Sequence, residues 1–350
     1  MGFGPALRGS RGAAVDANIG RRFFLMDGLR PSGHPSGHSL MIIKILGSAA
    51  GGGFPQWNCN GPHSAAVRAG VAGYRVRTQS SLAISADGKN WVLLNASPDL
   101  REQIAANPEL HPDKTGSRRN TPIKAVVVTN ADVDHIMGLI NLREGQPFSI
   151  YGSDRVLATI NGNSIFNVCK PDIVPRRTLS LDQPTEIEGA GVDLGLTIEA
   201  FAVPGKVALF LEKEGTGANF GSRDGDTIGL EITAKATGKR FFYVPGCAEV
   251  DAPLAQRIKN AELIFFDGTL FTDDEMLTQG LMPKTGKRMG HISVSGPDGS
   301  IEAFKPLNIK RRIYVHINNS NPILDEKSEA RKVVDAASWE VGYDGMEIRL

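Results

Sequence analysis

The chain has 350 residues, of which 41% are apolar and 22% charged, ordinary proportions for a globular protein with a sizeable core. Its 39 basic and 38 acidic residues leave a formal charge of +1 without a long basic block, so nucleic acid is not an expected partner. Three widely spaced cysteines argue against a disulfide framework, and no apolar run approaches the roughly 20 residues of a membrane-spanning helix. We therefore expect a cytoplasmic protein without membrane insertion.

Residues 1–40 are rich in Gly, Arg, Ser and Pro and show no sustained periodicity, which indicates a flexible N-terminal leader. Arg21 and Arg22 are similar to a twin-arginine export signal, but the apolar segment that such a signal requires does not follow them. We expect one folded domain over residues 41–350.

Strand patterns begin at residues 41–46, and a glycine-rich turn without phosphate-loop spacing follows. Residues 80–85 and 91–95 predict a hairpin around Asp87 and Gly88, and Ser97 is the predicted N-cap of the next helix. Many strands with few interspersed helices favour two mainly antiparallel or mixed sheets flanked by helices over a doubly wound parallel sheet. Further strands are predicted at residues 125–129, 148–151, 196–201, 228–233, 240–245, 263–266 and 311–317, and helices at 136–143 and 252–260.

Chemistry-bearing side chains follow several of these strands. Asp132, Asp134 and His135 place two carboxylates and an imidazole within four residues, where a metal site and a solvated or helix-capping turn are both reasonable interpretations. Other strand ends carry single candidates, and a lone strand-end histidine is more often structural. These candidates are His291, His316 and Asp267.

The order of these segments resembles the metallo-β-lactamase superfamily, especially its phosphodiesterase-like branch. Five segments carry a closer resemblance: residues 47–59 (GSAAGGGFPQWNC), 77–81 (RTQSS), 95–101 (NASPDLR), 142–145 (LREG) and 316–325 (HINNSNPILD). With these segments, the chain resembles the pyrroloquinoline quinone biosynthesis protein B family over residues 41–350. This resemblance implies an α/β (α+β) fold, a metallo-β-lactamase-like αββα sandwich.

The chain departs from the superfamily signature H-x-H-x-D-H, whose first two histidines serve one metal of a binuclear pair. Asn130 and Asp132 stand at those positions, whereas Asp134 and His135 match. The next histidine is missing near residues 203–205, and the bridging aspartate is missing near residues 246–247. The resemblance, with these departures, makes a binuclear hydrolase improbable.

After these losses, the resemblance implies a single metal bound by Asp134, His135 and His316. Two imidazoles and one carboxylate are the ligand set of non-haem Fe(II) oxygenases. The resemblance implies an iron-dependent hydroxylase that uses O₂ on the tyrosine ring of a peptide-derived precursor of the quinone cofactor (PQQ), a glutamate crosslinked to tyrosine. Mononuclear Fe(II) is the expected cofactor, and Zn(II) is its expected substitute in purified protein.

Within this hypothesis, Asp132 and His291 either hydrogen-bond to the metal ligands or transfer protons, although either could instead be a ligand. Asp267 orients His291 or His316, unless it only caps a turn. The alternatives are a carrier that escorts PQQ or its precursor toward the periplasm and, less favoured, a zinc hydrolase. A homodimer is the default expectation for an enzyme of this size.

Overall fold

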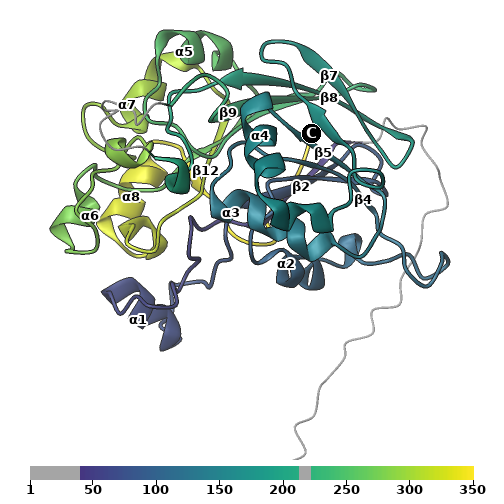
Figure 1. Ribbon diagram of the computed structural model, residues 1–350. Coiled ribbons are helices and arrows are strands. Elements are labelled where there is room, and N and C mark those ends of the chain that lie inside the picture. Colours follow the sequence, from purple (N-terminus) through teal and green to yellow (C-terminus); the bar gives the residue numbers. More distant parts are fainter. Residues whose placement is uncertain (1–39, 213–221) are drawn as a thin grey trace, which may run out of the picture. The chain divides into compact units, whose positions relative to one another are not determined.

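The computed structural model describes residues 40–212 and 222–350, and this part of the chain is built on two seven-stranded β-sheets (Figure 1). The predicted leader thus lies outside the described residues, except for Leu40. In spatial order, the first sheet contains β14 (Glu347–Arg349), β1 (Ile42–Gly47), β2 (Ser81–Ser85), β3 (Trp91–Leu94), β4 (Ile123–Val127), β5 (Ser149–Gly152) and β6 (Arg176–Thr178). The second contains β13 (Glu340–Val341), β12 (Arg311–Val315), β11 (Leu263–Asp267), β10 (Arg240–Val244), β9 (Ile228–Ala234), β8 (Val192–Ala202) and β7 (Pro184–Gly189).

Both sheets are mixed, as the sequence allows. In the first sheet, β14, β1, β2 and β3 pair antiparallel, whereas β3, β4, β5 and β6 pair parallel. The second sheet repeats this division, with β10 to β13 forming its parallel half. Parallel strands end at the same edge of a sheet, where ligand sites of open α/β sheets form. Asp132, Asp134 and His135 follow β4, Asp267 ends β11, and His316 follows β12, all strands of the parallel halves. His291 lies in a loop after the 3₁₀ helix at Lys287–Met289.

Alternating side chains give each sheet two buried faces. Val127 on β4 and Phe265 on β11 belong to the core between the sheets, whereas their neighbours Val126 and Phe266 belong to outer cores. The strands therefore read as nearly continuous apolar runs, which is typical of sheets that are covered on both sides.

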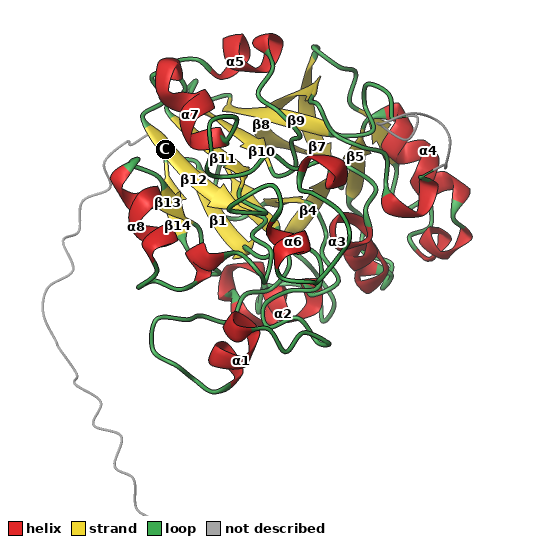
Figure 2. Cartoon of the chain, turned by 90° about the vertical axis from the view of Figure 1, so that its left-hand side faces the viewer, coloured by secondary structure: helices red, strands yellow, loops and turns green. Residues whose placement is uncertain are grey.

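Helices supply the outer layers, and Figure 2 shows them around the strands. The outer core of the first sheet includes residues of α2 (Leu100–Ala106), α3 (Val133–Ile136) and α4 (Asp154–Gly162). That of the second sheet includes residues of α5 (Ala252–Ile258), α7 (Ser300–Phe304) and α8 (Glu329–Ala336). The short helix α1 (Pro62–Arg68) adds Val67 to this second outer core, whereas the short helix α6 (Glu275–Thr278) contributes no residue to either outer core. The predicted αββα sandwich is confirmed, and none of the described helices has the length and apolar character to cross a membrane.

Two local predictions were wrong. The helix after β3 begins at Leu100 with Asp99 as its N-cap residue, because the Ser97 hydroxyl instead donates a hydrogen bond to Gln103. Residues 136–143 do not form one α-helix, since α3 gives way to a 3₁₀ helix at Met137–Leu142. Gly138 explains the tight winding there, because its backbone is pressed against Ser97 so closely that a Cβ would lie 2.1 Å from that carbonyl oxygen.

Candidate functional site

Asp134 and His135 reach the site because β4 ends beside a short helix. The chain leaves β4 at Val127, and α3 begins at Val133, so both side chains lie in the first turn of α3. The helix start is anchored across the fold, since the His135 carbonyl accepts a hydrogen bond from the Ala96 N–H after β3. The sequence Asp-x-Asp-His is therefore fixed between two parallel strands.

His316 follows β12 in the second sheet and has a backbone φ of 55°. A non-glycine residue in this left-handed region is uncommon and costs on the order of 1–3 kcal/mol, so the surrounding structure must hold it. Backbone hydrogen bonds from the Gly268 N–H to the Val315 carbonyl and from the Ile317 N–H to the Ser48 carbonyl stabilise this conformation. The strained backbone turns the imidazole of His316 toward α3.

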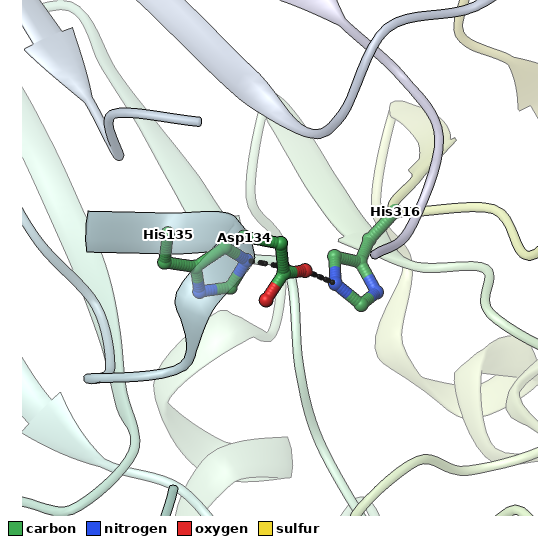
Figure 3. Close-up of side chains that lie close together, drawn as sticks. All are labelled: Asp134, His135 and His316. Carbon is green, nitrogen blue, oxygen red and sulfur yellow. Dashed lines mark hydrogen bonds and ion pairs between the residues drawn. The ribbon is translucent and has the colours of Figure 1, made fainter. Parts of the chain in front are cut away.

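The three side chains converge, as Figure 3 shows. Oδ2 of Asp134 lies 3.0 Å from Nε2 of His316 and 3.8 Å from Nε2 of His135. Each residue offers one ligand atom, and the three atoms lie within 4.8 Å of one another. Two imidazole nitrogens and one carboxylate oxygen around a single point form a donor set for a transition metal.

The surroundings of the His135 imidazole show whether a metal ion fits between these three side chains. Its side chain is 1% exposed, and its Nδ1 lies 2.7 Å from Oδ1 of Asn130, which fixes the proton on Nδ1. Nε2 of His135 is buried and makes no hydrogen bond with any residue in the described ranges 40–212 and 222–350. A buried acceptor nitrogen without a hydrogen bond is costly unless a ligand uses its lone pair, so these residues fit a bound metal.

A second network lies directly beside this cluster. The buried Asp267 carboxylate is 2.6 Å from Nδ1 of His291 and accepts hydrogen bonds from the Thr269 hydroxyl and the Cys247 N–H. The Thr269 hydroxyl is also 2.8 Å from Nδ1 of His316. Asp267, His291 and His316 form another group that could hold a metal. Its facing atoms all take part in hydrogen bonds, whereas the first group includes Nε2 of His135, which has none among the described residues. We therefore place the candidate metal at Asp134, His135 and His316.

Burial and charge set the protonation of the cluster. Burial lowers the pKa of His135 to about 4, so its imidazole is neutral near pH 7 and can donate a lone pair. Burial alone would raise the pKa of Asp134, but the charges of His135 and His316 and a hydrogen bond from His316 hold it far below the ordinary value. For His316, burial alone would lower the pKa of the imidazole, but the hydrogen bond with Asp134 and the charges of the nearby carboxylates together raise it. Asp134 is therefore ionised at any ordinary working pH.

The cluster lies at the wall of a cavity of about 720 Å³, a size typical of small-molecule sites. Asp132 lines this cavity too, and its Oδ1 accepts a hydrogen bond from the Leu209 N–H at 2.8 Å rather than capping α3. Further lining residues are Gln56, Lys206, Leu209, Glu212, Met276, Leu281, Met282, Lys284, Met289 and Asn319.

The structure brings five of the six predicted site residues into adjoining networks and leaves Asp132 on the cavity wall. Sequence reasoning did not assign Asn130 or Thr269, although both lie in segments that it singled out. The missing superfamily histidine near residues 203–205 has a structural explanation, because a Cβ at Gly205 would lie 2.7 Å from Oγ1 of Thr227.

Comparison with known proteins gives the same fold. Residues 90–317 match the family model of the beta-lactamase superfamily domain. Coenzyme PQQ synthesis protein B of Methylobacterium nodulans is 49% identical, and that of Xanthomonas oryzae is 47% identical; each alignment covers 89% of this chain and the whole relative. A crystal structure of Zn²⁺-bound PqqB from Methylobacterium extorquens is 47% identical, covers 88% of this chain and all of that chain, and has a TM-score of 0.82. The chain therefore belongs to the coenzyme PQQ synthesis protein B family of the beta-lactamase superfamily.

Proposed function

We propose that the chain acts in the synthesis of coenzyme PQQ as a mononuclear non-haem Fe(II) hydroxylase. Its substrates are O₂, a crosslinked Glu-Tyr precursor and an external two-electron reductant; one oxygen atom replaces a hydrogen of the tyrosine ring as a hydroxyl group, and the other is reduced to water. The observation that carries the proposal is the buried Nε2 of His135, which makes no hydrogen bond within the described residues and faces Asp134 beside His316. Two imidazoles and one carboxylate form the facial ligand set of Fe(II) oxygenases.

The metal would be held by Asp134, His135 and His316. Bound Fe(II) supplies the redox chemistry that lets O₂ react with an aromatic ring, with positions open to both substrates. The Zn²⁺ in the Methylobacterium extorquens relative supports a metal in this family, and we propose Zn(II) as the substitute in purified protein.

The surrounding residues hold the ligands in place. Asn130 fixes the tautomer of His135 through Nδ1, and Thr269 does the same for His316. Such outer partners orient the rings and keep each Nε2 available.

Two further side chains are proposed to move protons. Asp267 engages Nδ1 of His291, which leaves Nε2 of that ring to exchange a proton with the substrate hydroxyl. Asp132 lines the same cavity and acts on His135 and His316 through its charge. We assign His291 and Asp132 as proton-transfer groups and Asp267 as the residue that orients His291.

A binuclear hydrolase is disfavoured by the side chains present. Asn130 donates no metal-binding nitrogen, and its Oδ1 is taken up by the His135 ring. The atoms of Asp267 and Thr269 that face His291 and His316 are engaged in hydrogen bonds. A carrier for PQQ or its precursor would use the same cavity without turnover, so activity separates it from the hydroxylase.

The test is O₂ uptake by anaerobically purified protein that has been reconstituted with Fe(II) and given a tyrosine-containing precursor together with a chemical reductant such as ascorbate. We expect about one iron per chain and substrate-dependent uptake, both of which are lost in His316→Ala. His111→Ala is the matched control, because His111 is exposed and lies outside the cavity. Tight precursor binding without uptake by the iron-loaded protein would instead favour the carrier. Cytoplasmic location and a homodimer remain predictions.

A further inference from the structure

The glycine-rich turn at residues 51–53 brings the cavity wall close to Asp134. Gly51 is exposed and lines the cavity. A Cβ at Gly51 would lie 3.6 Å from both Cγ and Oδ2 of Asp134, and the three atoms nearest to it would all belong to that residue. Oδ2 is the oxygen that lies 3.0 Å from Nε2 of His316 (Figure 3). The absence of a side chain at Gly51 therefore leaves space directly beside a candidate metal-binding atom.

Hydrogen bonds on both sides hold this turn in place. The Ala50 N–H donates to the carbonyl of Ile317 at 2.8 Å, next to the last candidate metal ligand in the chain. The Gly52 N–H donates to Oε1 of Gln79 at 3.0 Å. Gln79 is held in turn by Asp99, whose Oδ2 accepts hydrogen bonds from its N–H at 2.8 Å and from its side-chain amide at 3.1 Å. The space beside the metal cluster is therefore part of a fixed backbone structure.

Two of the three glycines are required by the local structure. Gly52 and Gly53 have φ values of 93° and 71°, which other residues rarely adopt. At Gly52, a Cβ would also lie 2.9 Å from Cγ of Gln56, which is too close for two carbon atoms. The φ of Gly51 lies outside the left-handed region, and 3.6 Å from Asp134 is an ordinary van der Waals contact. Neither backbone conformation nor packing therefore demands a glycine at position 51.

A glycine at a position that suits other residues lowers stability, because it gives the unfolded chain more conformational freedom. Glycine beside a ligand site has another use, since it lets a ligand approach the backbone closely. The cavity also has an apolar surface, to which Met276, Leu281 and Met282 contribute. Thioether and aliphatic side chains pack well on aromatic rings, and a flat ring fits into a narrow space. The observations around Gly51 therefore favour an aromatic ligand group.

We propose that Gly51 is a specificity-determining residue, over which the aromatic ring of the ligand reaches the metal centre. The edge of the ring lies against the α-carbon of Gly51, beside Oδ2 of Asp134, so that any side chain at position 51 would compete with the ring for the same space. This assignment rests on the proposed function only in that the bound ring is taken to be the one that reacts.

The test compares the dipeptide Glu-Tyr with Glu-Ala, which lacks the ring. Both are titrated into Zn²⁺-loaded full-length protein, and calorimetry gives the affinities. We expect wild type to prefer Glu-Tyr at least about tenfold, because burial of an aromatic ring is favourable. An added methyl group in a closely packed position opposes binding, so this preference should fall about tenfold in Gly51→Ala and disappear in Gly51→Leu.

Metal content and thermal stability separate this effect from damage to the fold. Gly51→Ala should hold as much zinc as wild type, and its midpoint of thermal unfolding should be equal or higher. Gly52→Ala should lower the midpoint, because its φ and the contact with Gln56 both disfavour a side chain. Gly162→Ala is the matched control and should leave the preference unchanged. Gly162 is the last residue of α4, lies outside the cavity lining, and has no described atom beyond its own helix within 4 Å of its Cβ position.

An unchanged preference in both Gly51 variants would overturn the proposal. A midpoint that falls as far in Gly51→Ala as in Gly52→Ala would also overturn it, because the backbone would then require glycine at both positions. Equal affinity of wild type for the two dipeptides would show that the ring has no such place. The measurement needs neither iron nor O₂. A ring preference that Gly51→Ala reduces would therefore establish the position of the ring even if the iron-loaded protein consumed no O₂, and only the hydroxylase proposal would then fail.

Discussion

The metal cluster and an ion-pair group of Lys206, Glu212 and Lys284 line one cavity but are built in different ways. Asp134, His135 and His316 follow strands of the two sheets, and each histidine ring is held by a hydrogen bond through Nδ1. The ion-pair group comes from segments outside the sheets, and its long side chains meet on Glu212. The side chains of His135 and His316 are 1% and 7% exposed, whereas that of Lys284 is 29% exposed.

This difference separates two tasks. Metal ligands must be held within a few tenths of an ångström, which strand ends and second partners provide. Recognition of a flexible, charged ligand tolerates movement, so loops and long side chains suffice. Substitutions in the cluster should therefore remove metal and activity, whereas substitutions of Lys206 or Lys284 should leave the metal in place.

The largest expected effect belongs to Asp134→Ala. Loss of the carboxylate removes a ligand and leaves two buried histidines facing each other, so metal content should fall from about one per chain to nearly none, with no measurable turnover. Metal analysis after anaerobic Fe(II) loading checks this. Asp172→Ala, on the exposed surface, is the matched control and should load normally. Full iron and full turnover in Asp134→Ala would show that the centre lies elsewhere.

Asp132→Asn should lower kcat about a hundredfold without loss of metal, because the amide removes a proton-transfer group. Its remaining oxygen can still accept the Leu209 N–H, so KM should change little. Steady-state kinetics separate the two parameters. A raised KM with an unchanged kcat would mean that Asp132 only positions the Leu209 turn.

Thr269→Val tests the link between the two hydrogen-bonded networks. The hydroxyl contacts Nδ1 of His316 and the carboxylate of Asp267, so its loss should weaken metal affinity about tenfold to a hundredfold. Competition with a chelator measures this affinity. Thr269→Ser keeps the hydroxyl and should behave nearly as wild type; equal losses in both variants would point to packing instead.

The smallest effect on activity is expected for Glu275→Gln; Glu275 is the first residue of α6. Glu275 accepts hydrogen bonds from Ser320, four residues beyond His316, and from the Phe271 N–H. Burial raises the pKa of Glu275 to about 7. Because this folded-state value exceeds the ordinary one, the stabilisation is fully present below about pH 4.5 and is lost as the pH rises through 7.

The free energy of unfolding of wild type, relative to Glu275→Gln, should therefore fall by at most about 3 kcal/mol between pH 4.5 and 8. Denaturant titrations at several pH values measure this difference. Glu302→Gln is the control, because Glu302 is an exposed residue of α7, and the stability of this variant relative to wild type should not depend on pH in this way. A parallel pH dependence in wild type and Glu275→Gln would contradict the assignment.

The sequence predicts the part of the site that local patterns encode. Apolar runs ending in polar turns placed Asp134, His135 and His316 at strand ends, and the family resemblance predicted their role as ligands of iron. The role of Thr269 was not predicted, because its hydroxyl contacts a histidine 47 residues away. The ion pair of Glu212 with Lys284 was not predicted for the same reason, since the two residues meet only through the tertiary fold.

The same limit explains the errors in local structure. Serine is a favoured N-cap residue, but the Ser97 hydroxyl donates a hydrogen bond to the Gln103 side chain and therefore does not cap the helix. The 3₁₀ segment after α3 follows from the close approach of Gly138 to a neighbouring loop. Propensity describes isolated segments, and packing between distant segments overrides it at these points.

The most direct test of the central claim is the fate of oxygen. Iron-loaded protein is incubated with the crosslinked Glu-Tyr precursor under ¹⁸O₂ in ordinary water, and the product is analysed by mass spectrometry. The account predicts that every oxygen atom added to the tyrosine ring is ¹⁸O from O₂, and that His316→Ala gives no labelled product. Label taken from H₂¹⁸O in the reversed experiment, or unchanged precursor released from the wild-type protein, would contradict it.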